Sequence, residues 1–151
     1  MGMARSGSRV GLFGGTFDPI HFGHLRAAEE VAEVLSLEKV IFVLSAFPPH
    51  KRGEELLPAG DRWEMLRRAL KGNPLFEPSD VEIRRGGKSY TVETLSYYRE
   101  RFKEEEIFFI LGADAFLEMH TWKEYKRFPL LCSLAVISRP GFDPQGAKVT
   151  E

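Results

Sequence analysis

Hydrophobic residues along the chain gather into short continuous runs, separated by segments with helical spacing. Runs of about four to eight apolar residues bounded by turn residues are typical of strands covered on both faces. Four such runs are RVGLFGG (9–15), KVIFVL (39–44), EIFFIL (106–111) and SLAVIS (133–138), and a fifth strand is predicted within FEPSDVEIRR (76–85).

The segments between these runs favour helices. Three are predicted, at residues 24–37, about 61–70, and 91–102. In the first, one face is apolar, formed by Leu25, Ala28, Ala32 and Leu35. Alternating strands and helices indicate an α/β fold: a Rossmann-like, doubly wound, mainly parallel five-stranded sheet with helices on both faces.

In a sheet of this kind the ligand lies beyond the carboxyl ends of the strands, where the strand order reverses. The segments that follow the predicted strands are 14–24, 45–53, 85–91, 112–122 and 138–141. All of the histidines of the chain fall within them, namely His21, His24, His50 and His120. We therefore expect the functional site at this edge of the sheet.

Composition narrows the class of protein. The 151 residues suit one domain, which we place at residues 9–151 after a flexible tail at residues 1–8. The net charge of -1 argues against a nucleic-acid partner, and no apolar run reaches the roughly 20 residues of a membrane span. Cys132 is the only cysteine and lies in an apolar run, so we expect a buried, unreactive thiol and a cytoplasmic protein.

The stretch GGTFDPIHFGH (14–24) carries the densest set of unusual residues. Gly14 and Gly15 permit positive φ and close approach of a ligand to the backbone. Free N–H groups here and at the start of the following helix would attract anions. His21 and His24 reach the same space if a helical turn begins between them, so they could bind phosphate oxygens and stabilise charge that develops there. A zinc site would need further ligands nearby, and Asp18 before proline is more typical of a turn.

These residues also carry a resemblance to a known family. GTFDPIHFGH resembles the signature of the His-x-Gly-His nucleotidyltransferases, and five further segments narrow it to the bacterial nicotinate-nucleotide adenylyltransferases. They are PPHK (48–51), SYTVETL (89–95), LGADAF (111–116), Trp122 and ISRPG (137–141). The resemblance implies transfer of AMP from ATP to nicotinate mononucleotide, which yields deamido-NAD and pyrophosphate. It also implies Mg²⁺ carried with the ATP phosphates, and no covalent enzyme intermediate.

The resemblance assigns roles to individual residues. The ATP-binding residues would be Gly14, Gly15, Thr16, Phe17, His21 and His24, with His21 and His24 catalytic. The residues that bind the other substrate groups would be His50, Lys51, Thr91, Asp114, Trp122 and Arg139. Among these, Thr91 would lie against the nicotinate, Asp114 would hold a ribose hydroxyl, and Trp122 would stack on the pyridine ring. From the residues alone, Thr91 could equally be a helix N-cap and Trp122 a core residue.

The chain departs from the family pattern at its carboxyl end. Relatives continue past the RPG segment to a Ser/Thr-rich motif ending in arginine that holds ATP phosphates, and we expect this domain to lack that part. Two alternatives stay open: an enzyme similar to phosphopantetheine adenylyltransferase, or a truncated nucleotide-binding module with little activity. The oligomeric state is not predicted.

Overall fold

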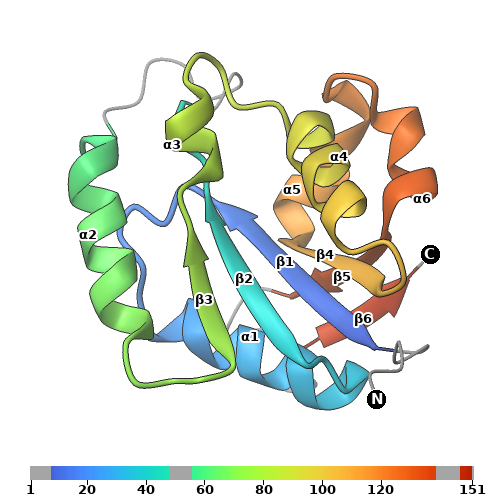
Figure 1. The fold of residues 1–151 in the computed structure, drawn as a ribbon, viewed down its shortest axis with the longest axis horizontal. Helices are drawn as coiled ribbons and strands as arrows, with labels where there is room; N and C mark the ends of the chain where they lie inside the picture. Colours follow the sequence, from blue (N-terminus) through green and yellow to red (C-terminus); the bar gives the residue numbers. More distant parts are fainter. Residues whose placement is uncertain (1–7, 48–55, 139–146, 151) are drawn as a thin grey trace.

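The computed structural model describes residues 8–47, 56–138 and 147–150. Its strands form one six-stranded sheet in the order β3-β2-β1-β4-β5-β6 (Figure 1). They are β1 (Arg9–Gly15), β2 (Lys39–Leu44), β3 (Phe76–Ser79), β4 (Glu106–Gly112), β5 (Ser133–Ile137) and β6 (Ala147–Thr150). The strand order reverses between β1 and β4, because the chain runs outward through β2 and β3 and then returns to the other side of β1.

All five predicted strands are present and run parallel. A sixth, β6, pairs antiparallel with β5 and was not predicted, because its four residues, AKVT, are too short and too polar to form an apolar run. The strand within residues 76–85 ends at Ser79, and the chain continues as a short helix. The mainly parallel, doubly wound sheet is therefore confirmed and is extended at one edge.

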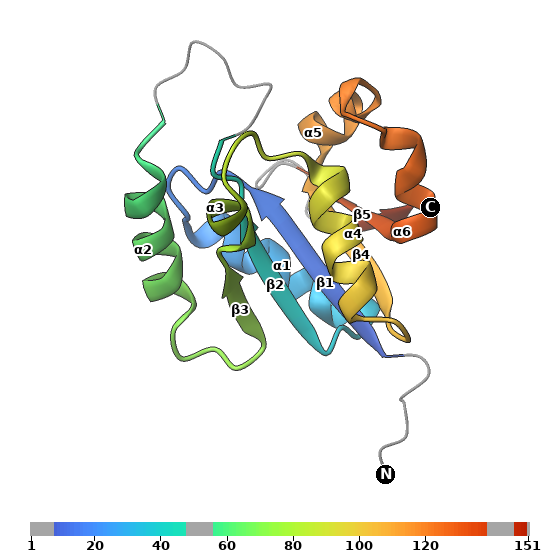
Figure 2. The same cartoon turned by 45° about the horizontal axis from the view of Figure 1, so that its top comes forward.

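The helices cover both faces of the sheet (Figures 1 and 2). They are α1 (Phe22–Leu35), α2 (Ala59–Leu70), α3 (Val81–Arg85), α4 (Thr91–Arg101), α5 (Ala113–Glu118) and α6 (Phe128–Leu131), with 3-10 turns η1 (Met119–Thr121) and η2 (Tyr125–Arg127). The helices pack on two apolar clusters, one on each face of the sheet. Helices α1 and α2 pack on the face that carries Phe13 of β1, whereas α3, α4 and α6 pack on the face that carries Leu12. Successive strand residues point to opposite faces, so each central strand supplies both cores.

Helix α1 shows how the local sequence sets the site. Its buried residues are Ala28, Val31, Ala32 and Leu35. The helix begins two residues before the predicted start, because His21 is its N-cap, and it ends at Leu35, because Ser36 adopts a left-handed φ of 56°. The start of α1 thus lies directly beyond the turn that follows β1.

Candidate active site

Two cavities meet at the carboxyl edge of the sheet, one on each face. The α4-side cavity has a volume of about 470 Å³, and the α1-side cavity about 490 Å³. Both are bordered by the same four residues, namely Gly14, Gly15, Thr16 and Gly112. These residues lie at or just after the ends of β1 and β4, where the strand order reverses. The edge of the sheet therefore separates two spaces, each large enough for a small ligand.

The two predicted histidines line the α1-side cavity and cap α1 together. The Nδ1 atom of His21 accepts from the N–H of Gly23 at 3.0 Å, and Nδ1 of His24 accepts from the N–H of His21 at 3.1 Å. The two ring centroids are 4.0 Å apart. A ring whose Nδ1 accepts a hydrogen bond carries its proton on Nε2. Both imidazoles are thus oriented by the backbone and present Nε2–H as a donor.

This cap corrects one expectation. The backbone N–H groups of His24 and Leu25 donate to the carbonyl of His21, and that of Gly23 donates to the His21 ring. The start of α1 therefore does not offer these N–H groups to an anion, because the reciprocal cap already uses them. The groups that this end of α1 presents to an anion are instead the Nε2–H groups and the positive end of the helix dipole.

His24 lies in an aromatic surrounding. Its ring centroid is 5.2 Å from that of Phe17 and 6.1 Å from that of Phe13, in edge-on geometry. Burial, and to a lesser degree the neighbouring His21, lower the pKa of His24 from 6.5 to about 4. The free protein at neutral pH thus holds His24 as a neutral donor.

The lowered pKa of His24 predicts an acid-dependent loss of stability. Between pH 6.5 and 4 the unfolded chain binds more protons at this residue than the folded one, so stability falls as the pH falls through that window. From pH 7 to 5 the contribution should be on the order of 1 kcal/mol, after allowing for partial exposure of the ring. Urea unfolding of the wild type and of His24→Gln at both pH values measures it. The variant keeps an N3 side chain suited to the cap and does not titrate, so an equal acid loss in both proteins would contradict the prediction.

The turn between β1 and α1 differs from our expectation for the glycines. Gly14 and Gly15 continue the extended backbone of β1, and the positive φ falls on Phe17, at 46°. Phe17 is 2% exposed and packs on Phe42, with ring centroids 5.7 Å apart. Gly14 lies in a tight space, because a Cβ there would lie 3.1 Å from the Phe109 ring. Phe17 borders the α1-side cavity and contacts the His24 ring in edge-on geometry.

A buried arginine on α2 holds this turn and was not predicted. Arg62 is 2% exposed. Its guanidinium donates to four backbone carbonyls, those of Leu57 at 2.7 Å, Ser45 at 2.9 Å, Ala46 at 3.0 Å and Thr16 at 3.1 Å. The loops after β1 and β2 are thereby tied together. Spacing offers one signal: Arg62 precedes Leu66 and Leu70 by four and eight residues and so shares their buried face.

Asp18 lies on the same turn and has the structural role that its Asp-Pro setting indicates. Its Oδ1 accepts from the backbone N–H of Leu57 at 3.2 Å, which fixes the segment before α2. Its charge also opposes the fall in the pKa of Arg62 that burial causes. Asp18 borders the α1-side cavity as well.

Thr91 and Trp122 come together in the α4-side cavity. Thr91 is the first residue of α4, and the N-cap is Tyr90, so the alternative of Thr91 as the cap is wrong. Trp122 packs on the core, with its ring centroid 6.5 Å from that of Phe109 and 6.3 Å from that of Phe128, and it also borders the cavity.

Among the other predicted substrate-binding residues, the structure describes only Asp114, and it does not border this cavity. Asp114 lies in the first turn of α5 and borders the α1-side cavity, with the histidines rather than with Thr91 and Trp122. His50, Lys51 and Arg139 lie outside the described residues.

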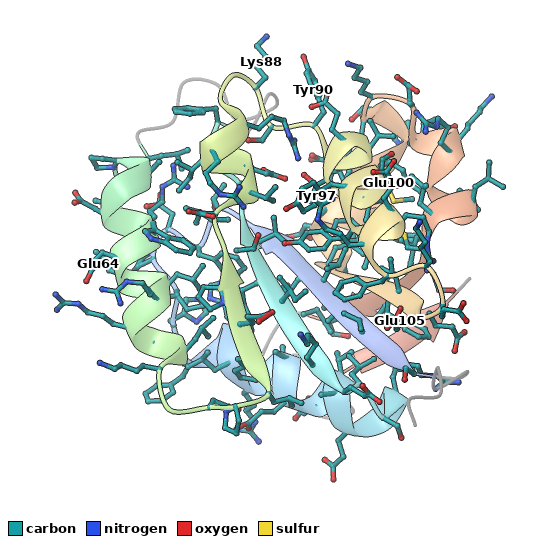
Figure 3. The ribbon with its side chains drawn as sticks, viewed as in Figure 1. Glu64, Lys88, Tyr90, Tyr97, Glu100 and Glu105 are labelled. Atoms are coloured by element: carbon teal, nitrogen blue, oxygen red, sulfur yellow. The ribbon has the colours of Figure 1, made fainter. Side chains whose placement is uncertain are left out.

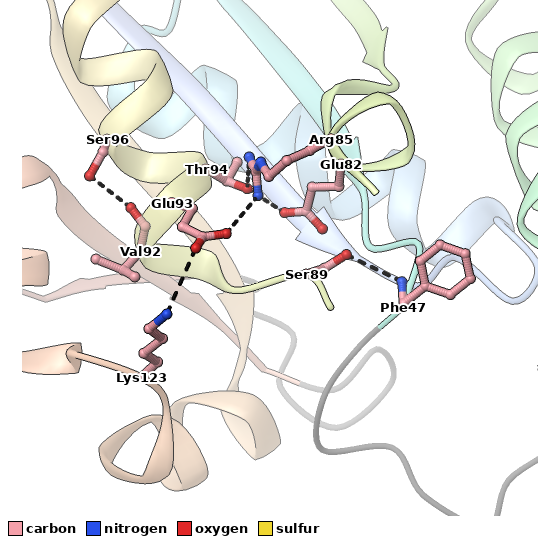
Figure 4. Close-up of polar contacts among 9 residues, drawn as sticks. All are labelled: Phe47, Glu82, Arg85, Ser89, Val92, Glu93, Thr94, Ser96 and Lys123. Atoms are coloured by element: carbon pink, nitrogen blue, oxygen red, sulfur yellow. Dashed lines mark hydrogen bonds and ion pairs between the residues drawn. The ribbon is translucent and has the colours of Figure 1, made fainter. Parts of the chain in front are cut away.

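A chain of polar contacts runs along the α4-side cavity, and sequence reasoning missed it (Figure 4). The Thr94 hydroxyl donates to Glu82 Oε2 at 2.5 Å, and Arg85 donates to Thr94 Oγ1 at 3.1 Å. Arg85 and Lys123 both pair with Glu93, at 3.4 and 3.8 Å. The contacts thus join α3 to α4 and to the segment after η1.

The rim of this cavity is formed by the loop between α3 and α4. Figure 3 shows Tyr90 at this end of the molecule, with its side chain pointing away from the sheet. The Lys123 ammonium lies 4.4 Å from the centroid of the Tyr90 ring. Ser89 and Phe47 exchange two hydrogen bonds, of 2.9 and 3.2 Å, which tie this loop to the segment after β2. Both sides of the cavity mouth are therefore anchored.

In the part of the chain that the structure describes, no cluster of three or more His, Cys, Asp or Glu side chains is arranged to hold a metal ion. None of the helices described there has the length and apolar character needed to cross a membrane. Burial, more than any neighbouring group, raises the pKa of the Cys132 thiol to about 12, so the thiol is held in its unreactive form.

Comparison with known proteins identifies the family to which this chain is similar. The chain matches the cytidylyltransferase-like family over residues 12–150. A Desulfitobacterium hafniense (strain Y51) protein, named a probable nicotinate-nucleotide adenylyltransferase, is 51% identical over 136 residues, which are 90% of this chain and 66% of that protein. A Thermus thermophilus protein of the same name is 49% identical over 134 residues, which are 89% of this chain and 71% of that protein.

A solved structure shares the fold. It is that of Plasmodium falciparum nicotinic acid mononucleotide adenylyltransferase complexed with NaAD, with a TM-score of 0.75, 18% identity, and coverage of 90% of this chain and 67% of that one. The chain spans slightly less than two thirds of the Desulfitobacterium protein. With relatives near 50% identity and a family match over most of its length, this chain belongs to the cytidylyltransferase-like family, among the nicotinate-nucleotide adenylyltransferases.

Proposed function

We propose that this protein transfers AMP from ATP to nicotinate mononucleotide and releases deamido-NAD and pyrophosphate. The observation that carries the proposal is the pair of cavities that share the glycine-rich end of β1. ATP occupies the α1-side cavity, beside the histidines, and the acceptor occupies the α4-side cavity, beside Thr91 and Trp122. The names of the relatives support this choice of substrates, as does the NaAD complex of the Plasmodium protein.

The reaction proceeds by in-line attack. A phosphate oxygen of the acceptor forms a bond to the α-phosphorus of ATP, and the bond from that phosphorus to the bridging oxygen breaks, which frees pyrophosphate. The described residues need supply no nucleophile, so they act by positioning and by stabilising charge. His21 and His24 donate from Nε2 to phosphate oxygens, and the donor of His24 strengthens as negative charge develops in the transition state.

The shared wall supports this geometry. Gly14, Gly15 and Gly112 carry no side chain, so the reacting phosphates can approach each other across the edge of the sheet. Arg62 keeps the carbonyl of Thr16 directed into the protein, which fixes the backbone at the crossing point. We propose that residues 9–151 work as one nucleotidyltransferase domain. Its ATP side is formed by Gly14 to Phe17, the histidine pair and Asp114.

Mg²⁺ enters with ATP in this proposal. The ion prefers oxygen ligands and is commonly bound through substrate phosphates, water and one or two carboxylates. The α1-side cavity offers that donor set, because Asp18 and Asp114 border it and no larger cage is formed by the described residues. These two carboxylates would hold the ion or its waters, and the ion would neutralise charge on the triphosphate.

The acceptor assignment predicts a clear kinetic preference. With ATP and Mg²⁺ present, pyrophosphate release should be at least about tenfold more efficient with nicotinate mononucleotide than with nicotinamide mononucleotide or phosphopantetheine, because a site built around a substrate's polar group rejects analogues that lack it. Values of kcat/KM for the three acceptors measure this. Equal or better use of phosphopantetheine would contradict the assignment, and ATP binding without pyrophosphate release would identify a binding module instead.

A further inference from the structure

One buried side chain of the α4-side cavity has no role in the reaction proposed above. Glu82 lies on α3, is 7% exposed and borders the cavity. Its Oε2 accepts the hydroxyl of Thr94, whereas its Oε1 is buried and has no hydrogen-bond partner among the described residues. An unpaired buried carboxyl oxygen is costly, and a ligand that supplies a partner there would recover that cost.

Glu82 lies close to the proposed binding site of the acceptor nucleotide. Thr91 and Thr94 both border the cavity from α4, and they are three residues apart, so Thr94 lies about one helical turn further along the same face. Figure 4 shows Glu82 and Thr94 meeting between α3 and α4, with the other carboxyl oxygen of Glu82 directed toward Ser89. If the acceptor ring lies against Thr91, a substituent of that ring is within one helical turn of Glu82.

We propose that Glu82, as a neutral acid, donates a hydrogen bond from Oε1 to the ring carboxylate of the acceptor nucleotide and thereby makes binding of the acid depend on pH. This inference rests on the proposed function. A protonated Glu82 and a ring carboxylate share one proton between two oxygens, which is a charge-assisted hydrogen bond. An ionised Glu82 would repel the same carboxylate, yet it would accept from the amide of nicotinamide mononucleotide.

The surrounding charges fit a carboxyl group that can be neutral. Burial is the largest influence and raises the pKa of Glu82, and Glu93 on α4 raises it further. Thr94, Ser89 and Arg85 act in the opposite direction. Arg85 is itself paired with Glu93, at 3.4 Å. A ligand carboxylate would add a second negative charge beside Glu82 and favour the neutral acid still more.

Among the described residues, two other charged side chains border this cavity, Lys123 and Glu118. Lys123 is paired with Glu93 at 3.8 Å rather than with Glu82.

Isothermal titration from pH 6 to 9 tests the proposal on the wild type and on Glu82→Gln. For the wild type, the affinity for nicotinate mononucleotide should fall by up to about tenfold per pH unit above the pKa of Glu82. Nicotinamide mononucleotide should show no such fall, and it controls for titration of the shared phosphate. Glu82→Gln should bind the acid with a flat pH profile, because its amide N–H donates at every pH.

Glu93→Gln is the matched control, since it removes a nearby carboxylate that does not border the cavity. It should keep the pH-dependent fall, with the midpoint displaced to lower pH. If Glu82→Gln fails to fold, Thr94→Val provides the test, because loss of its hydroxyl should move the midpoint to higher pH. A flat profile in the wild type, an unchanged fall in Glu82→Gln, or an unmoved midpoint in Thr94→Val overturns this inference alone. Absence of nicotinate mononucleotide binding at every pH overturns the proposed function itself.

Discussion

Replacing His24 with alanine should lower the turnover of ATP and nicotinate mononucleotide by about 100- to 1000-fold, the usual cost of losing one well-placed donor to a developing negative charge. His24 is held neutral by burial, and its Nδ1 is occupied by the N–H of His21. Its Nε2–H is therefore available without reorganisation when the transition state forms. ATP binding should fall much less, because the ground-state phosphates keep His21 and Mg²⁺. Pyrophosphate-release kinetics, with ATP binding measured separately, test both parts.

The cap makes a sharper comparison possible. In His24→Ala both the Nε2 donor and the cap to His21 are lost, so stability should also fall. His24→Gln retains a side chain that can accept from the His21 N–H, as glutamine does at N3 of a capping box. If catalysis depends on Nε2, His24→Gln should be nearly as slow as His24→Ala but as stable as the wild type. Turnover close to wild type in His24→Gln, or a loss of activity that follows the loss of stability, would contradict this role.

The second large effect is expected for Arg62→Met. The substitution keeps an unbranched apolar side chain but leaves four buried or partly buried carbonyl groups without the donors that the guanidinium supplies. Each buried polar group that loses its partner costs about 1–3 kcal/mol, and water can replace the lost donor for only some of the carbonyls. The free energy of unfolding should therefore fall by at least about 3 kcal/mol. Urea unfolding at pH 7 measures this loss.

Arg67→Met is the matched control, because Arg67 lies on the same helix and forms an ion pair with Glu64 at the surface. Exposed ion pairs contribute little, so the control should unfold almost as the wild type does. Arg62→Lys should fall between the two, since one ammonium cannot reach four carbonyls in the directions that a planar guanidinium serves. Equal stability of Arg62→Met and Arg67→Met would show that Arg62 does not hold the loops after β1 and β2.

The sequence predicted the elements that follow simple periodicity. Continuous apolar runs predicted four of the five parallel strands, and apolar residues three or four positions apart predicted α1 and α2. The short helices after β3 and β4 were missed, because segments of a few residues carry too little periodicity. The strand predicted within residues 76–85 ends at Ser79, because Val81 and Glu82 are buried in a helical turn that packs against β2 and α4.

For the candidate site, the residue types predicted where in the fold the site lies better than they predicted the role of each residue. The two histidines and the glycines pointed to the edge where the strand order reverses, and the cavities lie there. Arg62 and Glu82 were missed, because an arginine or a glutamate in a sequence is expected to face solvent, and only the tertiary structure encloses these two. The capping role of His21 was also missed, since histidine is not among the preferred N-cap residues.

The wall that the two cavities share has a consequence for inhibitor design. Its residues are three glycines and one threonine, so no bulky side chain separates the proposed adenosine site on one face of the sheet from the proposed acceptor site on the other. A single compound that joins the two fragments through a short, uncharged linker could cross this edge and occupy both cavities at once. The second fragment would then bind at the high effective concentration that the linker imposes, and weak fragments would yield a strong inhibitor without a triphosphate.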